Sequence, residues 1–132
     1  MKIIILGAGQ VGASVAENLV SEANDITLVD TSPDYLAELR ERLEVRTVCG
    51  NAASPSVLRD AGADDADLLI AVTQSDQTNL CACRIAKTLF NLPTRIARLR
   101  STDYVDHPEL LDENNFAVDF SICPEQIVTD YI

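Results

Sequence analysis

The chain has 132 residues, 47% of them hydrophobic, and a formal net charge of −11 at pH 7. This length suits one domain with its own core. The apolar runs are all shorter than the roughly 18–20 residues of a transmembrane helix, and the N-terminal run is too short for a signal peptide. Nucleic acids are bound through basic stripes, which this acidic chain lacks. We therefore expect a soluble, cytoplasmic domain with no nucleic acid as partner and no insertion into a membrane.

The four cysteines are Cys49, Cys81, Cys83 and Cys123. Only one residue separates Cys81 from Cys83, whereas structural zinc pairs usually have a two-residue spacer, and the only histidine is His107. Cytosolic proteins rarely hold disulfides. We therefore expect buried or half-buried free thiols and no metal site.

The first thirty residues carry a dinucleotide-binding pattern. An apolar run at 2–6 predicts a strand, and Val11, Val15 and Leu19 recur at helical spacing. A second apolar run, at 26–29, ends at Asp30. The strand and the helix are joined by a turn with glycines at 7, 9 and 12. Together these elements match the fingerprint of a dinucleotide site.

Each part of this pattern has a predicted role. Gly7 permits the tight turn, Gly9 lets the backbone approach a pyrophosphate, and Gly12 lets the helix pack closely on the strand. The phosphates would meet unpaired N–H groups at the helix start. Asp30 would accept hydrogen bonds from the ribose hydroxyls and repel a 2′-phosphate, which favours NAD over NADP.

The next segments read as helix, strand, helix and strand. Ser32 and Pro33 form a helix start, with leucines at 36, 39 and 43 on one face. Residues 45–49 predict a third strand, and Ser54-Pro55 starts a short helix that ends at Gly62. The almost wholly apolar segment 67–72 fits a strand that is buried on both faces of a parallel sheet.

The second half continues the alternation. Residues 73–76 open a longer helix, 94–99 predict a fifth strand, 107–111 a weak helix and 117–120 a sixth strand, and Pro124 begins a last helix. Short connections and right-handed crossovers then predict the fold class: α/β, a Rossmann-type doubly wound parallel sheet of six strands in order 3-2-1-4-5-6 with helices on both faces. We expect residues 1–132 to form a single domain.

In such a sheet the ligand lies beyond the carboxyl ends of the strands, between the first and the fourth. This rule gathers groups from five strands into one cleft: Gly7 to Gly12, Asp30 with Thr31, Gly50 with Asn51, Thr73 with Gln74, and Arg98 with Arg100. Asn51 is equally suited to an adenine edge and to a turn. Thr73 suits a helix cap, a ligand contact or both. Arg98 is favoured as a bidentate phosphate ligand over a surface ion pair, and Arg100 is not.

No catalytic set accompanies this pattern. A dehydrogenase needs a second region for substrate and a proton donor or acceptor near the nicotinamide. The sequence offers no Ser/His/Asp or Cys/His arrangement and no Tyr-x-x-x-Lys pair. A sensing domain is therefore favoured over an enzyme.

Several motifs taken together resemble the family of potassium-conductance regulatory domains, known as RCK or KTN domains. The resemblance covers essentially the whole chain, and many relatives have Asp where this chain has Asn51. The motifs that carry it are Gly7-Ala8-Gly9-Gln10-Val11-Gly12, Asp30, Gly50-Asn51-Ala52, Ala61-Gly62-Ala63 with Ala66-Asp67, Thr73 with Asp76 and Asn79, and Ile96-Ala97-Arg98.

The resemblance implies a site and a partner. It implies that Gly7, Ala8, Gly9, Gln10 and Val11 hold a pyrophosphate, that Asp30 holds the adenosine ribose, that Thr73 and Gln74 line the cleft, and that Arg98 lies by the phosphates or the nicotinamide half. The ligand would be NAD or NADH, or ATP or ADP at the same site. The candidate site residues are Gly7, Ala8, Gly9, Gln10, Val11, Gly12, Asp30, Thr31, Asn51, Ala52, Thr73, Gln74 and Arg98.

The resemblance also implies an assembly. Homodimers would form a tetrameric ring at the inner face of the membrane, beneath a potassium channel or transporter subunit of the Trk type. The chain would be the first nucleotide-binding part of a longer tandem protein. We hypothesise that 104–132, apolar at Phe116, Phe120, Ile127 and Tyr131, is the dimer contact; its alternative is ordinary core at the sheet edge.

Two other functions remain open at this point. One is the cofactor-binding domain of an NAD-dependent oxidoreductase, cut from a longer chain. The other is a regulator of a metabolite or proton antiporter with the same fold.

Overall fold

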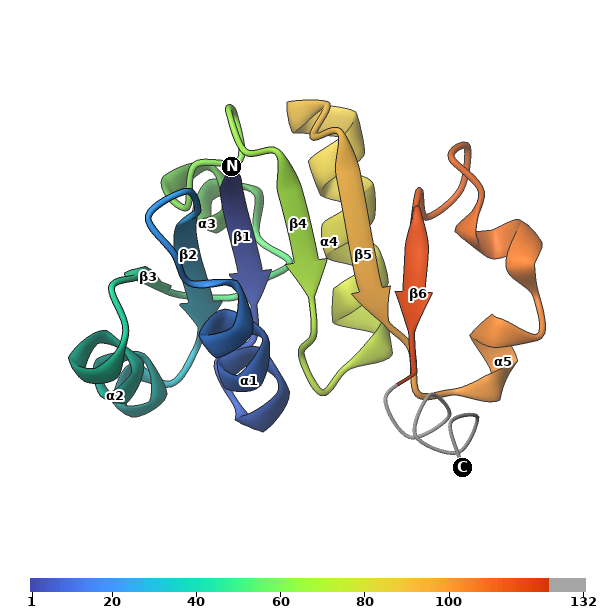
Figure 1. Ribbon diagram of the computed structural model, residues 1–132. Helices are drawn as coiled ribbons and strands as arrows, with labels where there is room; N and C mark the ends of the chain where they lie inside the picture. The colour runs from blue at the N-terminus through green and yellow to red at the C-terminus, as the bar shows by residue number, and fades with distance from the viewer. Residues whose placement is uncertain (124–132) are drawn as a thin grey trace.

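The computed structural model describes residues 1–123, so the helix expected from Pro124 lies outside the described residues. Six parallel strands form one sheet in the order β3-β2-β1-β4-β5-β6 (Figure 1). This confirms the predicted fold class and strand order. The strands are β1 (Lys2–Leu6), β2 (Asp25–Asp30), β3 (Arg46–Cys49), β4 (Leu68–Ala71), β5 (Thr94–Arg98) and β6 (Phe120–Ile122).

Helices cover both faces of the sheet. α1 and α2 lie on one face and α3 and α4 on the other, whereas α5 follows β5 at the side of β6 (Figure 1). Within the described residues, no helix combines the length and the apolar character needed to span a membrane. The helices are α1 (Gln10–Leu19), α2 (Pro33–Arg42), α3 (Pro55–Asp60), α4 (Asp76–Phe90), α5 (Thr102–Val105) and a 3₁₀ helix, η1 (Pro108–Leu111).

The alternation of side chains along the strands divides the core into two layers. In β1, Ile3 and Ile5 join the layer beneath α1 and α2, with Leu36 and Leu39. Ile4 and Leu6 join the other layer, with residues of α3 and α4 such as Leu58 and Leu80. Because both faces are buried, β1 is apolar after Lys2 and β4 is apolar throughout, as the sequence predicts.

The predicted helix starts are confirmed at α2 and α4. The Ser32 hydroxyl accepts a hydrogen bond from the Tyr35 N–H at 3.3 Å, and Pro33 occupies the first turn. At α4 the Ser75 hydroxyl accepts from the Thr78 N–H at 3.1 Å. These caps fix where the two helices begin, beside the carboxyl ends of β2 and β4.

The sixth strand lies later than predicted. Residues 117–120 were expected to be extended, but Ala117 has a φ of 59°, in the left-handed region, and β6 starts at Phe120. The N–H groups of Ala117 and Val118 donate to the carbonyls of Asp112 and Leu111, so this segment folds back on the turn before it. The prediction was wrong because alanine gives no local signal for a left-handed residue.

The side chain of Arg95 holds the segment 117–119 in place. This side chain is only 3% exposed and donates to the Leu92 carbonyl and, from Nε, to the Ala117 carbonyl at 2.6 Å. It also forms an ion pair with Asp119, whose Oδ2 lies 3.3 Å from Nη2. The buried guanidinium therefore joins the approach to β6 to the amino end of β5.

Replacing Arg95 with methionine is expected to lower the free energy of unfolding by about 3 kcal/mol, because the carbonyls of Leu92 and Ala117 lose their buried donor and the ion pair with Asp119 is lost. Urea denaturation measures the loss. The matched control is Arg84→Met: Arg84 donates to the carbonyls of Glu113 and Asn115 in the same segment, but at the exposed surface. That change should cost less than about 1 kcal/mol, and equal losses for the two variants would contradict this account.

Cys49, Cys81 and Cys83 are free thiols, and the burial predicted for the four cysteines is confirmed only in part. Cys83 is buried in the core, and burial raises the pKa of its thiol to about 12. Cys123 is half-buried, whereas Cys49 and Cys81 are exposed. Cys49 is the last residue of the edge strand β3, and Cys81 lies on the outer face of α4. The prediction was wrong for these two because both stand among apolar residues, and the sequence pattern does not distinguish an exposed cysteine from a buried one there.

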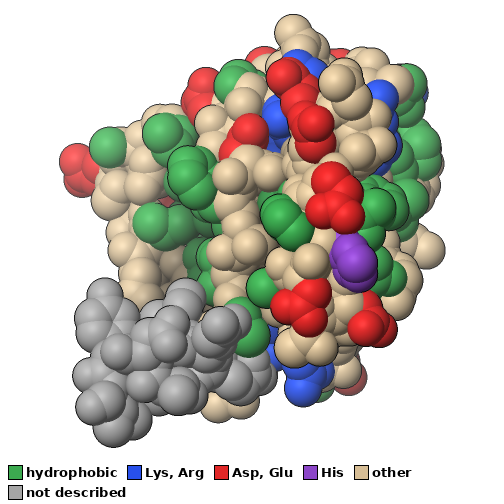
Figure 2. Space-filling model, turned by 90° about the vertical axis from the view of Figure 1, so that its right-hand side faces the viewer, with side chains coloured by type: hydrophobic (Ala, Val, Ile, Leu, Met, Phe, Trp, Pro, Cys, Tyr) green, Lys and Arg blue, Asp and Glu red, His purple; other side chains and the backbone are tan. Residues whose placement is uncertain are grey.

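The surface is predominantly acidic where β6, α5 and η1 lie. Figure 2 shows this side, with Asp and Glu side chains around the exposed His107 and apolar side chains between them. His107 Nδ1 lies 3.2 Å from a carboxylate oxygen of Glu109, a residue of η1. Val105 and Phe120, from the segment that was hypothesised to be the dimer contact, are 36% and 63% exposed.

Candidate nucleotide-binding site

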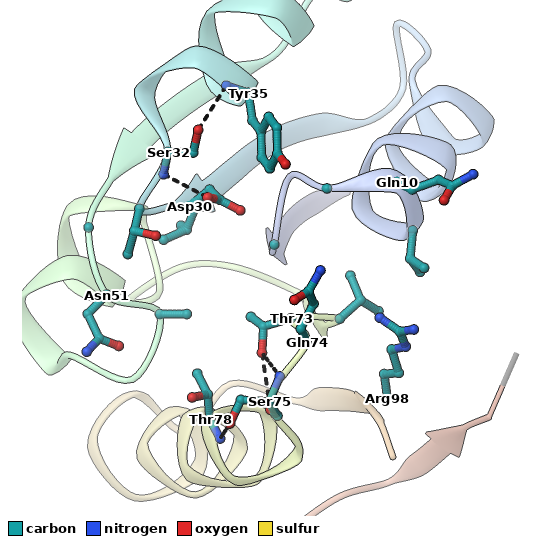
Figure 3. Close-up of a pocket in the computed structure, with 18 of the residues that line it drawn as sticks. Gln10, Asp30, Ser32, Tyr35, Asn51, Thr73, Gln74, Ser75, Thr78 and Arg98 are labelled. Carbon is teal, nitrogen blue, oxygen red and sulfur yellow. Dashed lines mark hydrogen bonds between the residues drawn. The ribbon is translucent and has the colours of Figure 1, made fainter. Parts of the chain in front are cut away.

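A cleft of about 730 Å³ opens at the carboxyl ends of the strands (Figure 3). It lies where the chain order of the sheet reverses, between β1 and β4, with groups from the ends of β2, β3 and β5 around it. This is the position at which open α/β sheets bind ligands. Eleven of the thirteen candidate residues line it: Gly7, Gly9, Gln10, Val11, Asp30, Thr31, Asn51, Ala52, Thr73, Gln74 and Arg98.

The three glycines of the turn have different surroundings. Gly7 has a φ of 109°, and a Cβ on it would lie 3.0 Å from the Val72 carbonyl oxygen. A Cβ on Gly12 would lie 1.7 Å from the Gly7 carbonyl oxygen, whereas a Cβ on Gly9 would meet nothing within 4 Å. Gly7 and Gly12 are thus required by the fold. Gly9 lines the cleft and leaves its space open to a ligand.

The start of α1 faces this open space. Gly9 is its N-cap and provides no side-chain hydrogen bond, in contrast to Ser32 and Ser75, which cap α2 and α4 at the rim of the same cleft. The first N–H groups of a helix have no partner within the helix. Uncapped, and at the positive end of the helix dipole, they suit a phosphate group.

The Asp30 carboxylate supports the turn as well as the cleft. Its Oδ2 accepts from the Ala8 N–H at 2.7 Å and its Oδ1 accepts from the Ser32 N–H at 2.8 Å. A carboxylate oxygen has more than one acceptor position, so both oxygens can still accept from ribose hydroxyls. Ala8 is buried and outside the lining of the cleft, and its N–H group is engaged by Asp30. Ala8 and Gly12 are therefore the two candidates that do not line the cleft and contribute only to the conformation of the turn.

At the far end of the cleft, Asn51 acts as a turn residue. Its Oδ1 accepts from the Ala53 N–H at 2.8 Å, and this leaves the Nδ2 group to face a ligand. Thr73 is not the cap of α4, because the N-cap of that helix is Ser75; the Thr73 Oγ1 accepts from the Ser75 N–H at 3.3 Å within the loop before the helix. Both also line the cleft, so an adenine contact by Asn51 and a ligand contact by Thr73 stay predictions.

Two arginines reach the cleft from the end of β5. Arg98 is 8% exposed and Arg100 is exposed, yet both line the cleft, and Figure 3 shows the Arg98 side chain beside the start of α1. Sequence reasoning favoured Arg98 and discounted Arg100. The cleft therefore offers an uncapped helix start and two guanidinium groups for anionic oxygens, and a carboxylate for hydroxyl groups.

Comparison with known families agrees with this geometry. The model of the TrkA-N domain matches residues 3–118. The chain belongs to the TrkA-N domain family. This confirms the resemblance stated from the sequence.

The relatives of this TrkA-N domain include longer proteins. It is 55% identical, over its full length, to the Trk system potassium uptake protein TrkA of Vibrio alginolyticus and covers 29% of that protein. The chain thus spans less than a third of the length of this relative.

Solved structures share the fold. The TrkA-N domain of the inner membrane protein ybaL from Escherichia coli superposes with a TM-score of 0.84 at 24% identity, over 98% of this chain and 92% of that one. The GsuK channel bound to NAD gives a TM-score of 0.81 at 20% identity, over 98% of this chain and 22% of that one.

Some residues of this TrkA-N cleft were missed from the sequence. Ser32 and Tyr35 come from the first turn of α2, and Ser75 and Thr78 from the start of α4. Val29 and Val72 were missed as well, whereas Gly50 lines the cleft as the sequence predicts. The helix residues were missed because no local sequence pattern shows which side chains at a helix start face the cleft. Among the described residues, the lining has no His, Cys, Lys or Glu side chain.

Proposed function

We propose that this TrkA-N domain is the nucleotide-binding part of the cytosolic regulatory subunit of a Trk-type potassium-uptake system. It binds NAD or NADH, or an adenine nucleotide in the same cleft, and the occupancy of the cleft biases the gate of a membrane channel or transporter subunit. The potassium system is supported by the names of the full-length relatives, and the ligand class by the cleft.

The observation that carries the proposal is the presence of two kinds of binding group in one cleft. Arg98 lies across the cleft from Asp30 (Figure 3), and the open helix start and Arg100 also line the cleft. The carboxylate of Asp30 is fixed by two backbone N–H groups. A diphosphate joined to a ribose presents anionic oxygens and hydroxyl groups, the two kinds of group that a dinucleotide fingerprint recognises. Asp30 favours NAD over NADP because a 2′-phosphate would carry a like charge.

A non-catalytic role fits the groups in the cleft better than hydride transfer. A dehydrogenase needs a proton donor or acceptor beside the nicotinamide. The one histidine, His107, is exposed and outside the lining. The nucleotide is therefore proposed to be sensed and not consumed, and the oxidoreductase domain is the less favoured function.

Gating follows from linkage. A ligand shifts the equilibrium between two states of an assembly only by the difference in its affinity for those states.

We propose that homodimers form a tetrameric ring at the inner face of the membrane, with 104–132 as the dimer contact. The exposed Val105 and Phe120 side chains support this; Ile127 and Tyr131 lie outside the described residues. A monomer at high micromolar concentration in equilibrium sedimentation would contradict the contact for this chain.

Calorimetric titration of the chain with NAD, NADH, NADP, ADP and ATP tests the ligand. We expect saturable binding of NAD, NADH or the adenine nucleotides at one site per chain, with NADP at least about tenfold weaker than NAD. His107→Ala should bind as the wild type does, whereas an oxidoreductase that used this histidine would lose activity. Absence of binding by all five nucleotides would overturn the proposal.

A further inference from the structure

Asn79 is a fully buried polar side chain beneath the cleft. It lies in the first turns of α4, is 0% exposed and does not line the cleft. A buried amide is stable only when its donors and acceptor have partners. Asn79 therefore has to be explained by the groups that it holds.

All the hydrogen-bonding groups of the Asn79 amide are engaged by two residues of the cleft. Its Oδ1 accepts from the Thr73 N–H at 3.0 Å and from the Thr73 hydroxyl at 2.7 Å. Its Nδ2 donates to the Thr73 carbonyl at 3.2 Å and to the Arg98 carbonyl at 2.9 Å. One side chain thus joins the end of β4 to the end of β5.

Asp76, one turn earlier on the same face of α4, extends this connection. Its carboxylate is 7% exposed and accepts from the Arg100 N–H at 3.0 Å and from the Ser101 N–H at 2.8 Å. The backbones of both arginines that reach the cleft are therefore held by α4. Arg98 is the last residue of β5, and Thr73 and Arg100 lie two residues beyond the ends of β4 and β5.

We propose that Asn79 is a positioning residue for the nucleotide, resting on the function proposed above. It does not touch the ligand. It fixes the Thr73 backbone and the point at which Arg98 leaves the sheet, and so it aims the Arg98 guanidinium at the anionic part of the ligand. Because the Thr73 hydroxyl is used by Asn79, Thr73 serves as a wall of the cleft and not as a phosphate donor.

The test compares Asn79→Leu, which keeps the branched shape and removes every hydrogen bond, with Leu80→Ala. Leu80 is the next residue of α4, is 1% exposed and packs in the core away from the cleft. Both variants should melt earlier than the wild type. Calorimetric titration with NAD and with ATP, at a temperature where each variant is folded, should show about tenfold weaker binding for Asn79→Leu and unchanged binding for Leu80→Ala. Asn79→Ser serves the same purpose if the leucine variant fails to fold.

A double-mutant cycle with Arg98→Met separates positioning from general loosening of the fold. If Asn79 acts through Arg98, then Asn79→Leu should weaken binding by less than about twofold once Arg98 is methionine. Full multiplication of the two effects, or affinity of Asn79→Leu equal to that of Leu80→Ala, would overturn the inference and leave the proposed function intact. Failure of the wild-type chain to bind either nucleotide would overturn both.

Discussion

Replacing Asp30 with alanine is expected to weaken the binding of NAD by about two orders of magnitude, because each hydrogen bond to a charged acceptor contributes about 1.5–3 kcal/mol. The carboxylate is held at the rim of the cleft by the N–H groups of Ala8 and Ser32. It is therefore already oriented when a ribose arrives, and no ordering of the side chain opposes binding.

The same contacts mean that loss of affinity alone does not prove a ribose contact. Without Asp30 the buried Ala8 N–H has no acceptor, which costs about 1–3 kcal/mol of stability and loosens the turn that faces the phosphates. Asparagine is a poor replacement, since its amide would set a donor against one of two N–H donors. A comparison of ligands, each measured with the same variant, removes this difficulty.

NADP supplies that comparison. Loosening of the turn should weaken NAD and NADP by similar factors, whereas loss of the carboxylate should also relieve the repulsion of the 2′-phosphate. The ratio of the two dissociation constants, measured by calorimetry, should therefore fall toward one in Asp30→Ala. If the wild-type chain binds NADP as tightly as NAD, or if the ratio is unchanged in the variant, Asp30 does not read the ribose.

The fold could be predicted from the sequence because its determinants are local and repeat along the chain. Apolar runs mark the buried strands, Ser-Pro pairs mark the starts of α2 and α3, and the glycine turn marks the switch from β1 to α1. The error at β6 has a different origin. The left-handed Ala117 is held by Arg95, 22 residues earlier, and a contact of that span leaves no mark on the residues around Ala117.

The site could be predicted where it depends on strand ends, and not where it depends on which side chains of α2 and α4 face the sheet. Asp30 and Arg98 end β2 and β5, Thr73 follows the end of β4 by two residues, and the switch-point rule places the three together. Tyr35 and Thr78 lie in the first turns of α2 and α4, and Asn79 lies beneath the cleft. Their roles follow from how α2 and α4 rest on the sheet, which side-chain packing decides.

The glycines at 12 and 9 provide a matched pair in which one methyl group has opposite consequences. In Gly12→Ala the new Cβ would lie 1.7 Å from the carbonyl oxygen of Gly7, a backbone atom that has no room to move. The start of α1 would have to shift away from β1. We expect a loss of about 3 kcal/mol or more in the free energy of unfolding, measured by urea denaturation.

In Gly9→Ala the methyl meets no protein atom within 4 Å, and the backbone φ of −73° suits alanine. Stability should change by less than about 1 kcal/mol, the scale of an altered N-cap. The methyl would, however, stand in the space that a pyrophosphate needs at the start of α1. We expect binding of NAD and ATP to weaken by roughly tenfold to a hundredfold, the equivalent of the 1–3 kcal/mol that overpacking costs.

The two variants must be compared in both measurements, because only the crossed pattern separates fold from site. A stable Gly9→Ala variant that binds nucleotide as the wild type does would place the phosphates away from the start of α1. A Gly12→Ala variant of normal stability would mean that α1 and β1 can separate at little cost, against the close contact in the structure. The expected pattern makes Gly12 a requirement of the fold, and Gly9 a requirement of the ligand alone.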